Sequence, residues 1–265
     1  MGESGYKKNS RKYLLMSFVS VAVFILVWWV CTAVLKLAKP ITLPDPITIV
    51  KTFITKLNHT APDGGTLIAN TFASVKIALS GYFAAIIIGV PLGILMAWFK
   101  PVDRFVRPLF DLLRPVPGIA WIPLMIVIFG IGMTSKVVVI FLTAFVPCVV
   151  NSYTGIRQTR DVHLWVGQTF GASNLQLLWT VAIPTALPFI MTGIRVALGS
   201  SWCAIVAAEL LASSEGLGFM IQQARGINRP DIIICGMLAI GAMGALMTFL
   251  LGIVEKRVVK GVMHK

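Results

Sequence analysis

Long runs of residues without Asp, Glu, Lys or Arg dominate this chain and constrain its fold more than any other feature. Five runs hold 20 to 23 residues each: Leu14–Leu35, Ile77–Phe99, Pro115–Ser135, Val137–Ile156 and Ile232–Val254. At about 1.5 Å per residue, a helix of roughly 20 residues crosses the hydrocarbon core of a bilayer. The runs therefore predict a protein that crosses a membrane several times as helices.

A sixth stretch, Leu164–Ile194, is also uncharged but is interrupted by Gly171, Pro184 and Pro188. Because glycine and proline end or bend helices, we interpret it as a cytoplasmic loop with short helices. The loop leads into a further span from about Thr185 to Leu211. The expected fold class is an all-α integral membrane protein with about six transmembrane helices.

The spans divide the chain into five parts. The first transmembrane span is interpreted as a retained anchor, because its apolar stretch is longer than the 7–15 residues usual in a signal peptide. We expect a cytoplasmic tail (1–13), a first transmembrane helix (14–37), a periplasmic segment (38–67), a five-helix core (68–255) with a cytoplasmic loop at about 158–183, and a cytoplasmic tail (256–265).

The composition agrees with a lipid environment and excludes other classes. Hydrophobic residues make up 57% of the chain and charged residues 12%, against about 25% charged residues in soluble domains. The net charge of +13 comes from basic residues between apolar runs, which does not fit a nucleic-acid-binding surface. The four cysteines and three histidines are scattered, so no metal site, disulfide framework or catalytic cluster is predicted.

The basic residues predict the orientation in the membrane. If the N-terminus is cytoplasmic, fourteen Lys and Arg residues lie in inner loops and tails and seven in outer ones. Lys and Arg accumulate on the cytoplasmic side, so both termini are expected there, in the inner membrane of a bacterium. The outer seven are Lys36, Lys39, Lys51, Lys56, Lys136, Arg225 and Arg229.

Two outer segments are too long for simple turns. Residues 40–66 begin with Pro-Ile-Thr-Leu-Pro-Asp-Pro and predict an extended entry followed by a short amphipathic helix through Ile49, Phe53 and Leu57. Residues 213–231 contain several glycines, which suits a folded external loop.

Charges inside the spans are the candidates for a solute pathway, because ionisable residues in a bilayer are costly. Arg195 and Glu209 are 14 residues apart on one predicted helix, so they share a face but cannot pair with each other. Arg195 either orders the inner half of the bundle or supplies positive potential for an anionic substrate. Glu209 is expected to anchor the external loop or a dimer contact rather than to touch substrate. The full set of pathway candidates is Asn151, Arg195, Ser200, Ser201, Trp202 and Glu209.

The uncharged loop near residue 171 resembles the cytoplasmic signature loop of ABC importer permeases. That pattern has a Glu-Ala-Ala triplet, a nearby glycine and a downstream Leu-Pro; this chain has the glycine and Pro184-Thr185-Ala186-Leu187-Pro188, but not the acidic residue or the two alanines. Taken alone, the loop also fits an interfacial helix on the inner leaflet. The positions that the resemblance assigns to contact with an ATPase are Trp165, Val166, Gly167, Phe170, Gly171, Ala172, Ser173, Leu175 and Pro184.

Further stretches extend the resemblance over about residues 40–256, to the permease subfamily for nitrate, sulfonate, taurine, bicarbonate and related compounds. They are Gly89-Val90-Pro91-Leu92-Gly93, Arg114-Pro115-Val116-Pro117, Phe129-Gly130-Ile131-Gly132, Gly193-Ile194-Arg195, Ala207-Ala208-Glu209 and Gly216-Leu217-Gly218.

The resemblance implies a type I importer permease fold, a cytoplasmic coupling helix, and a homodimer with the pathway between two copies. The chain contains no Walker A sequence, so ATP and Mg²⁺ are expected in a separate cytoplasmic subunit present in two copies. A periplasmic or lipid-anchored solute-binding protein is the other expected partner, and the chain itself is not expected to be an enzyme. The alternative class is an ion-gradient-driven secondary transporter or channel, which is expected to carry more acids within its spans.

Overall fold

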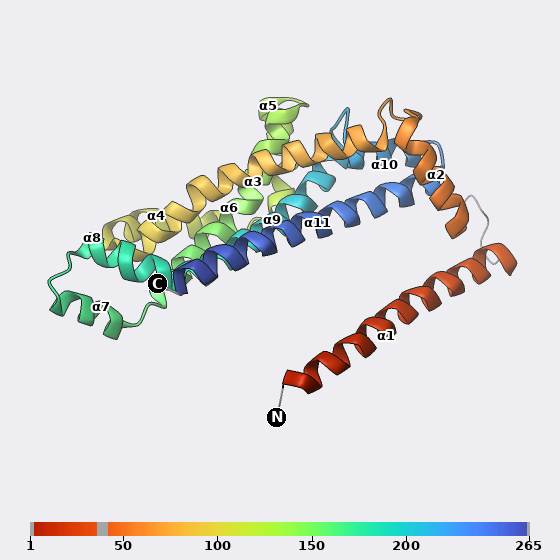
Figure 1. The fold of residues 1–265 in the computed structure, drawn as a ribbon. Helices are drawn as coiled ribbons and strands as arrows, with labels where there is room; N and C mark the ends of the chain where they lie inside the picture. The colour runs from red at the N-terminus through yellow and green to blue at the C-terminus, as the bar shows by residue number, and fades with distance from the viewer. Residues whose placement is uncertain (1–2, 36–41, 264–265) are drawn as a thin grey trace. The chain divides into compact units, whose positions relative to one another are not determined.

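The computed structural model describes residues 3–35 and 42–263, and within these ranges the chain folds into helices joined by turns and short loops, with no β-strand (Figure 1). The predicted all-α class is confirmed. The elements are α1 (Glu3–Trp29), a π-helical turn (Val30–Val34), α2 (Pro46–Asn58), α3 (Leu67–Trp98), α4 (Lys100–Leu113), a 3-10 turn (Gly118–Trp121), α5 (Ile122–Phe129), α6 (Met133–Arg157), α7 (Asp161–Thr169), α8 (Asn174–Leu177), a second π-helical turn (Leu178–Ala182), α9 (Ile183–Leu211), α10 (Leu217–Gly226) and α11 (Pro230–Met263).

The described helices account for about six membrane spans, as the sequence predicts. Five are long and apolar enough to cross a bilayer: Leu15–Val34, Leu67–Trp98, Met133–Arg157, Asn174–Leu211 and Pro230–Val259. A sixth span is counted if the bent pair Lys100–Leu113 and Gly118–Phe129, which meet at 80°, crosses as one broken span.

One predicted span has a different form. The run Pro115–Ser135 does not make one continuous helix, because the chain turns at residues 114–117, forms the short α5, and breaks again before α6. Gly130 has a φ of +76°, a backbone conformation that costs little only for glycine. The uncharged run Pro115–Ser135 therefore indicates an apolar environment, but it does not predict a single straight helix.

The chain forms two compact units, one of residues 68–219 with 239–265 and one of residues 1–67 with 220–238. In the larger unit, α6 and α9 pack along each other (Figure 1). A Cβ atom on Gly193 of α9 would lie 2.6 Å from the Cβ of Asn151 on α6, so the two backbones approach too closely for a larger residue. Close approach through small residues is the usual way in which helices pack in membranes.

The smaller unit contains the predicted amphipathic helix, which is α2. Asp45 caps its N-terminus by accepting hydrogen bonds from the hydroxyl and amide of Thr48, and the hydroxyl bond lowers the pKa of the Asp45 carboxyl. Ile49 is buried, as an inward-facing position of such a helix should be. Lys36 and Lys39, which the orientation argument placed on the outer side, lie outside the described residues.

Lys56 on α2 organises the loop that follows. The residue is 2% exposed. Its Nζ donates to the Asp63 carboxylate and to the carbonyl oxygens of Thr60, Ala61 and Gly65. A buried ammonium group is tolerated when acceptors surround it in this way. This lysine therefore has a structural role that its location in an outer loop did not reveal.

Candidate functional site

The loop predicted to contact an ATPase forms two short helices, α7 and α8, at one end of the larger unit (Figure 1). Gly171 turns the chain between them with a φ of +79°. Ser173 then starts α8 with a capping box, in which the Ser173 hydroxyl accepts from the Gln176 amide and the Gln176 side chain accepts from the Ser173 amide. Such caps satisfy backbone donors that a helix end leaves free. We call residues 158–183 the coupling loop.

The coupling loop presents apolar side chains to its surroundings. Trp165 is 62% exposed and Phe170 is 87% exposed, and Val166 and Leu175 also have more than half of their surface free. Uncovered apolar groups of this size on one compact knob indicate a protein-contact surface. The arrangement is that of a knob suited to an apolar groove in another protein.

The short helices of the coupling loop pack on each other and continue into α9. A Cβ atom on Gly167 would collide with the Leu177 side chain, and Leu177 itself is buried, so α7 packs closely on α8. Pro184 lies in the first turn of α9, directly after the π-helical turn that continues α8. Ala172 is half-buried and Ser173 is exposed. The predicted coupling residues thus lie on one continuous structural segment, and their contact with an ATPase stays a prediction.

Glu209 lies near the other end of α9 and holds the segment after it. The residue is 1% exposed. Its carboxylate accepts hydrogen bonds from the Ser74 hydroxyl at 2.7 and 2.9 Å and from the Gly218 amide at 2.8 Å. The Ser74 hydroxyl in turn accepts from the Leu217 amide at 2.9 Å. Glu209 is therefore enclosed by the backbone of residues 216–218 and by α3, and has the geometry of a loop anchor.

Lys136 supports the same segment from α6. It is buried, and its Nζ donates to the Ser213 hydroxyl at 2.8 Å. The sequence places Lys136 in an outer loop but does not reveal this contact, because Ser213 lies 77 positions away along the chain.

Arg195, the second charge on α9, forms an ion pair with Glu255 of α11. The Arg195 side chain remains half exposed. Glu255 lies directly after the last uncharged run, so the sequence reading did not pair it with a residue inside α9. The pair gives Arg195 a structural partner, while its effect on an anionic solute stays a prediction.

The other pathway candidates vary in their accessibility. Trp202 is buried and donates from Nε1 to the Ile240 carbonyl at 3.0 Å. Asn151 donates to the Pro147 carbonyl within its own helix at 2.8 Å. Ser201 is buried, its hydroxyl has no hydrogen-bond partner among the described residues, and Ser200 is half-buried. The contribution of these positions to a solute pathway stays a prediction.

Helix α4 carries a feature that the sequence reading treated only as inner-loop charge. Its Lys, Arg and Asp residues are at 100, 103, 104, 107 and 111, three or four positions apart except for the adjacent pair 103 and 104, and Arg114 follows directly after the helix. This is the helical period of a polar stripe. The opposite face packs on α3 and α6 through residues that include Val102, Val106 and Phe110. The same periodicity could have revealed the helix in the sequence.

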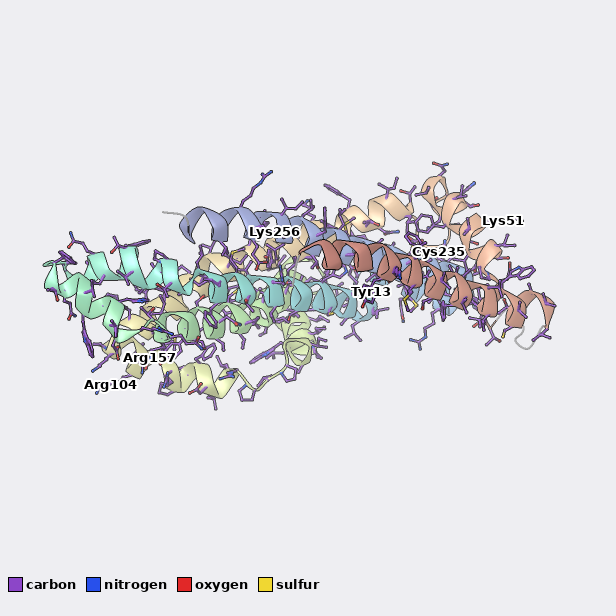
Figure 2. The ribbon with its side chains drawn as sticks, turned by 60° about the horizontal axis from the view of Figure 1, so that its bottom comes forward. Tyr13, Lys51, Arg104, Arg157, Cys235 and Lys256 are labelled. Carbon is purple, nitrogen blue, oxygen red and sulfur yellow. The ribbon has the colours of Figure 1, made fainter. Side chains whose placement is uncertain are left out.

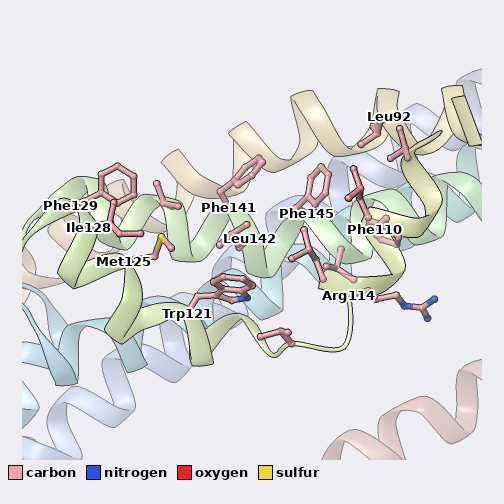
Figure 3. Close-up of a pocket in the computed structure, with 16 residues that line it drawn as sticks. Leu92, Phe110, Arg114, Trp121, Met125, Ile128, Phe129, Phe141, Leu142 and Phe145 are labelled. Carbon is pink, nitrogen blue, oxygen red and sulfur yellow. The ribbon is translucent and has the colours of Figure 1, made fainter.

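Two adjoining hollows lie beside α4. The apolar groove, of about 520 Å³, is lined by aliphatic and aromatic side chains of α3 to α6, among them Phe110, Phe141 and Phe145 (Figure 3). The polar pocket, of about 390 Å³, is lined by Met96, Arg107, Phe110, Asp111, Arg114, Val149, Val150, Tyr153 and Thr154. Phe110 and Arg114 border both hollows. Figure 3 shows the Arg114 guanidinium directed away from the apolar side chains.

The basic residues of α4 and of the end of α6 lie at the same end of the larger unit. Figure 2 shows Arg104 and Arg157 close together there, and the Arg107 guanidinium contacts the Tyr153 hydroxyl and lies 4.9 Å from the centre of its ring. Because α7 begins four residues after α6 ends, the polar pocket and the coupling loop are near the same membrane surface. Across residues 3–35 and 42–263, no group of three or more His, Cys, Asp or Glu side chains is placed to hold a metal ion.

An all-helical bundle of long apolar helices with an exposed two-helix loop at one end is the architecture of a membrane transport permease. The chain belongs to the family described as binding-protein-dependent transport system inner membrane component, whose sequence pattern matches residues 89–264. It is therefore a permease subunit of the ABC importer class, as the coupling-loop resemblance indicates.

Curated relatives cover nearly all of the chain. The taurine transport system permease protein TauC of Escherichia coli is 36% identical over 246 residues, covering 93% of this chain and 89% of the relative. The nitrate import permease protein NrtB of Synechocystis is 33% identical, covering 96% and 94%. The bicarbonate transport system permease protein CmpB of Synechococcus elongatus is 32% identical, covering 92% and 90%.

A solved structure shows the same fold. A chain from the inward-facing MetNI methionine ABC transporter superimposes with a TM-score of 0.57 at 18% identity, covering 72% of this chain and 93% of that chain. The expected type I importer permease fold is confirmed.

Proposed function

We propose that two copies of this chain form the membrane pathway of an ATP-driven importer for a small solute that carries an anionic group. The substrates named for the relatives, taurine, nitrate and bicarbonate, support this substrate range. A solute-binding protein outside the membrane delivers the solute, and two copies of a cytoplasmic ATPase subunit drive the change of access. Both termini lie on the cytoplasmic side.

The exposed coupling loop is the observation that carries this proposal. Apolar side chains such as Trp165 and Phe170 favour contact with another protein, and the resemblance of the loop to the ABC importer pattern supports the ATPase, rather than the lipid surface, as the partner. The segment from α8 into α9 is helical throughout, so a displacement of the knob reaches the membrane core through backbone hydrogen bonds. ATP binding and hydrolysis in the partner can thereby switch the pathway between its outward-open and inward-open forms.

The first experiment is purification of the chain from its native membrane in mild detergent, followed by identification of its partners. Reconstitution in liposomes then allows ATP hydrolysis and uptake of labelled taurine, nitrate or bicarbonate to be measured together. We expect an ATPase subunit at one copy per copy of this chain. A chain that purifies alone and transports with an ion gradient but without ATP contradicts the proposal and favours a secondary transporter.

The variant Gly171→Asp tests the coupling loop directly. We expect normal insertion and dimer formation but loss of ATP-dependent uptake, because a charge enters the apolar knob at its turn. Gly64→Asp is the matched control, since Gly64 has a φ of +82°, also borders open space and lies in a different loop. Normal uptake by the Gly171 variant would exclude this loop from coupling.

A further inference from the structure

The polar pocket beside α4 contains two opposite charges that no group in the described chain neutralises. Asp111 and Arg114 both line it and both are exposed. Among residues 3–35 and 42–263, neither forms a hydrogen bond or an ion pair through its side chain. The other charged residue of the lining, Arg107, is already occupied by Asp103 at 3.2 Å and by the Tyr153 hydroxyl.

The pocket lies about one to two helical turns from the end of α6, at the edge of the expected hydrocarbon core. Tyr153 is four residues and Val149 eight residues before the last residue of α6, which places the pocket about 6 to 12 Å along the helix from that end. A helix of 25 residues is about 37 Å long and exceeds the roughly 30 Å hydrocarbon core by only a few ångströms at each end. Charged side chains at this depth face protein or a water-filled path, because exposing them to lipid is costly.

The broken span gives the site a second favourable property. The chain bends by 80° between Lys100–Leu113 and Gly118–Phe129, and Arg114 lies in the connection between the two helices. Discontinuous helices of this kind recur at solute sites in membrane transporters, where unpaired backbone groups face the path. Here Arg114, at the break, borders both the polar pocket and the apolar groove.

We propose that Asp111 and Arg114 form a binding site for a small zwitterion, a solute that carries both an ammonium group and a sulfonate or carboxylate. The Arg114 guanidinium binds the oxyanion through paired N–H donors, and the Asp111 carboxylate accepts from the ammonium group. The volume of about 390 Å³ lies within the range of about 300 to 1,000 Å³ typical of small-molecule pockets. The inference rests on the proposed function and narrows it to solutes that carry both charges.

The distinction from simple anions comes from Asp111. The Asp111 carboxylate repels an anion such as nitrate or bicarbonate bound at Arg114, because both are negatively charged. A site for such an anion would therefore gain nothing from Asp111. An aminosulfonate satisfies both side chains at once. The proposal therefore predicts that an amine-free analogue of the same size binds more weakly than the zwitterion.

Binding to the purified full-length chain in detergent tests the site without requiring ATP-driven transport. The probes are taurine and ethanesulfonate, which lacks the amine, observed by saturation-transfer NMR over a concentration series. We expect the wild-type chain to prefer taurine by about tenfold or more, the factor expected for one hydrogen bond to a charged group. Asp111→Asn should remove this preference while leaving ethanesulfonate binding unchanged, and Arg114→Gln should weaken both probes.

Control variants separate the site from general effects of charge. Arg104→Gln, on the same helix but outside the pocket lining, should leave both affinities unchanged, and Asp111→Glu should retain the preference for taurine. Equal binding of the two probes to the wild type, absence of taurine binding, or an Asp111→Asn chain that still prefers taurine would each overturn the inference. Failure of ATP-driven uptake with intact taurine preference would instead overturn the proposed function alone.

Discussion

Gly216→Ala should loosen the segment that follows α9 more than any other single methyl group added there. Gly216 has a φ of +110°, and an added Cβ atom would lie 2.7 Å from Oε2 of Glu209 and closer still to Oε1. The alanine is therefore both strained in its backbone and in collision with a buried carboxylate. Relief of the collision requires Glu209 to move away from the donors that surround it.

The cost follows from these two effects. A non-glycine residue in such a backbone conformation costs about 1 to 3 kcal/mol, and loss of a hydrogen bond to a charged group costs about 1.5 to 3 kcal/mol. The total is about 2.5 to 6 kcal/mol. At roughly 2 to 4 °C per kcal/mol for a chain of this size, the melting temperature should fall by about 10 °C.

Thermal unfolding of the purified chain, followed with a thiol-reactive dye in a Cys31→Ser, Cys203→Ser background, measures this effect because the two remaining cysteines, Cys148 and Cys235, are fully buried and react only after unfolding. Gly130→Ala is the matched control: Gly130 has a φ of +76° but an added Cβ meets no atom within 4 Å. Backbone strain alone should lower its melting temperature by only a few degrees. If the two variants melt at the same temperature, the contact between Gly216 and Glu209 contributes nothing and the reasoning fails.

Three further predictions concern other parts of the chain. Arg195→Ala and Glu255→Gln should each reduce uptake, because each breaks the ion pair between α9 and α11; uptake that rises in the Glu255 variant would show that free positive charge matters rather than the pair. Lys56→Met should cost about 3 to 5 kcal/mol because it removes the cation from a buried ion pair, as thermal unfolding will show, whereas Lys51→Met, at an exposed position of the same helix, should have little effect. Gly167→Val should separate α7 from α8 and reduce ATP-dependent uptake without reducing the amount of chain in the membrane, and unchanged uptake would argue against close packing there.

The sequence was most informative where lipid dictates the pattern. Uncharged runs located four of the five long spans, since each backbone polar group in a bilayer must be satisfied within a helix. The glycine and prolines near residue 171 located the coupling loop because they have local effects on the backbone. The same reasoning failed for Pro115–Ser135, where an apolar composition also suits a bent segment packed against other helices.

Partners that are distant in sequence could not be predicted. Ser74 reaches Glu209 across 135 positions, and Arg195 meets Glu255 across 60, because helix packing rather than local pattern brings them together. Asp111 and Arg114 are a different case. Their helical spacing was visible, but α4 was read as inner-loop charge because basic residues at the end of a span usually mark the cytoplasmic side.

The uninterrupted helical run from Asn174 to Leu211 connects the two ends of the larger unit mechanically. Its 38 residues extend over about 57 Å, with the coupling loop at one end and Glu209 near the other. A stiff rod that tilts about its middle moves its ends in opposite directions, so a tilt of about 5° displaces each end by roughly 2.5 Å over this length. That displacement is close to the length of the hydrogen bonds that hold Glu209 to Ser74 and Gly218. A small push on the coupling loop is therefore enough to break or remake contacts at the far end of the same helix.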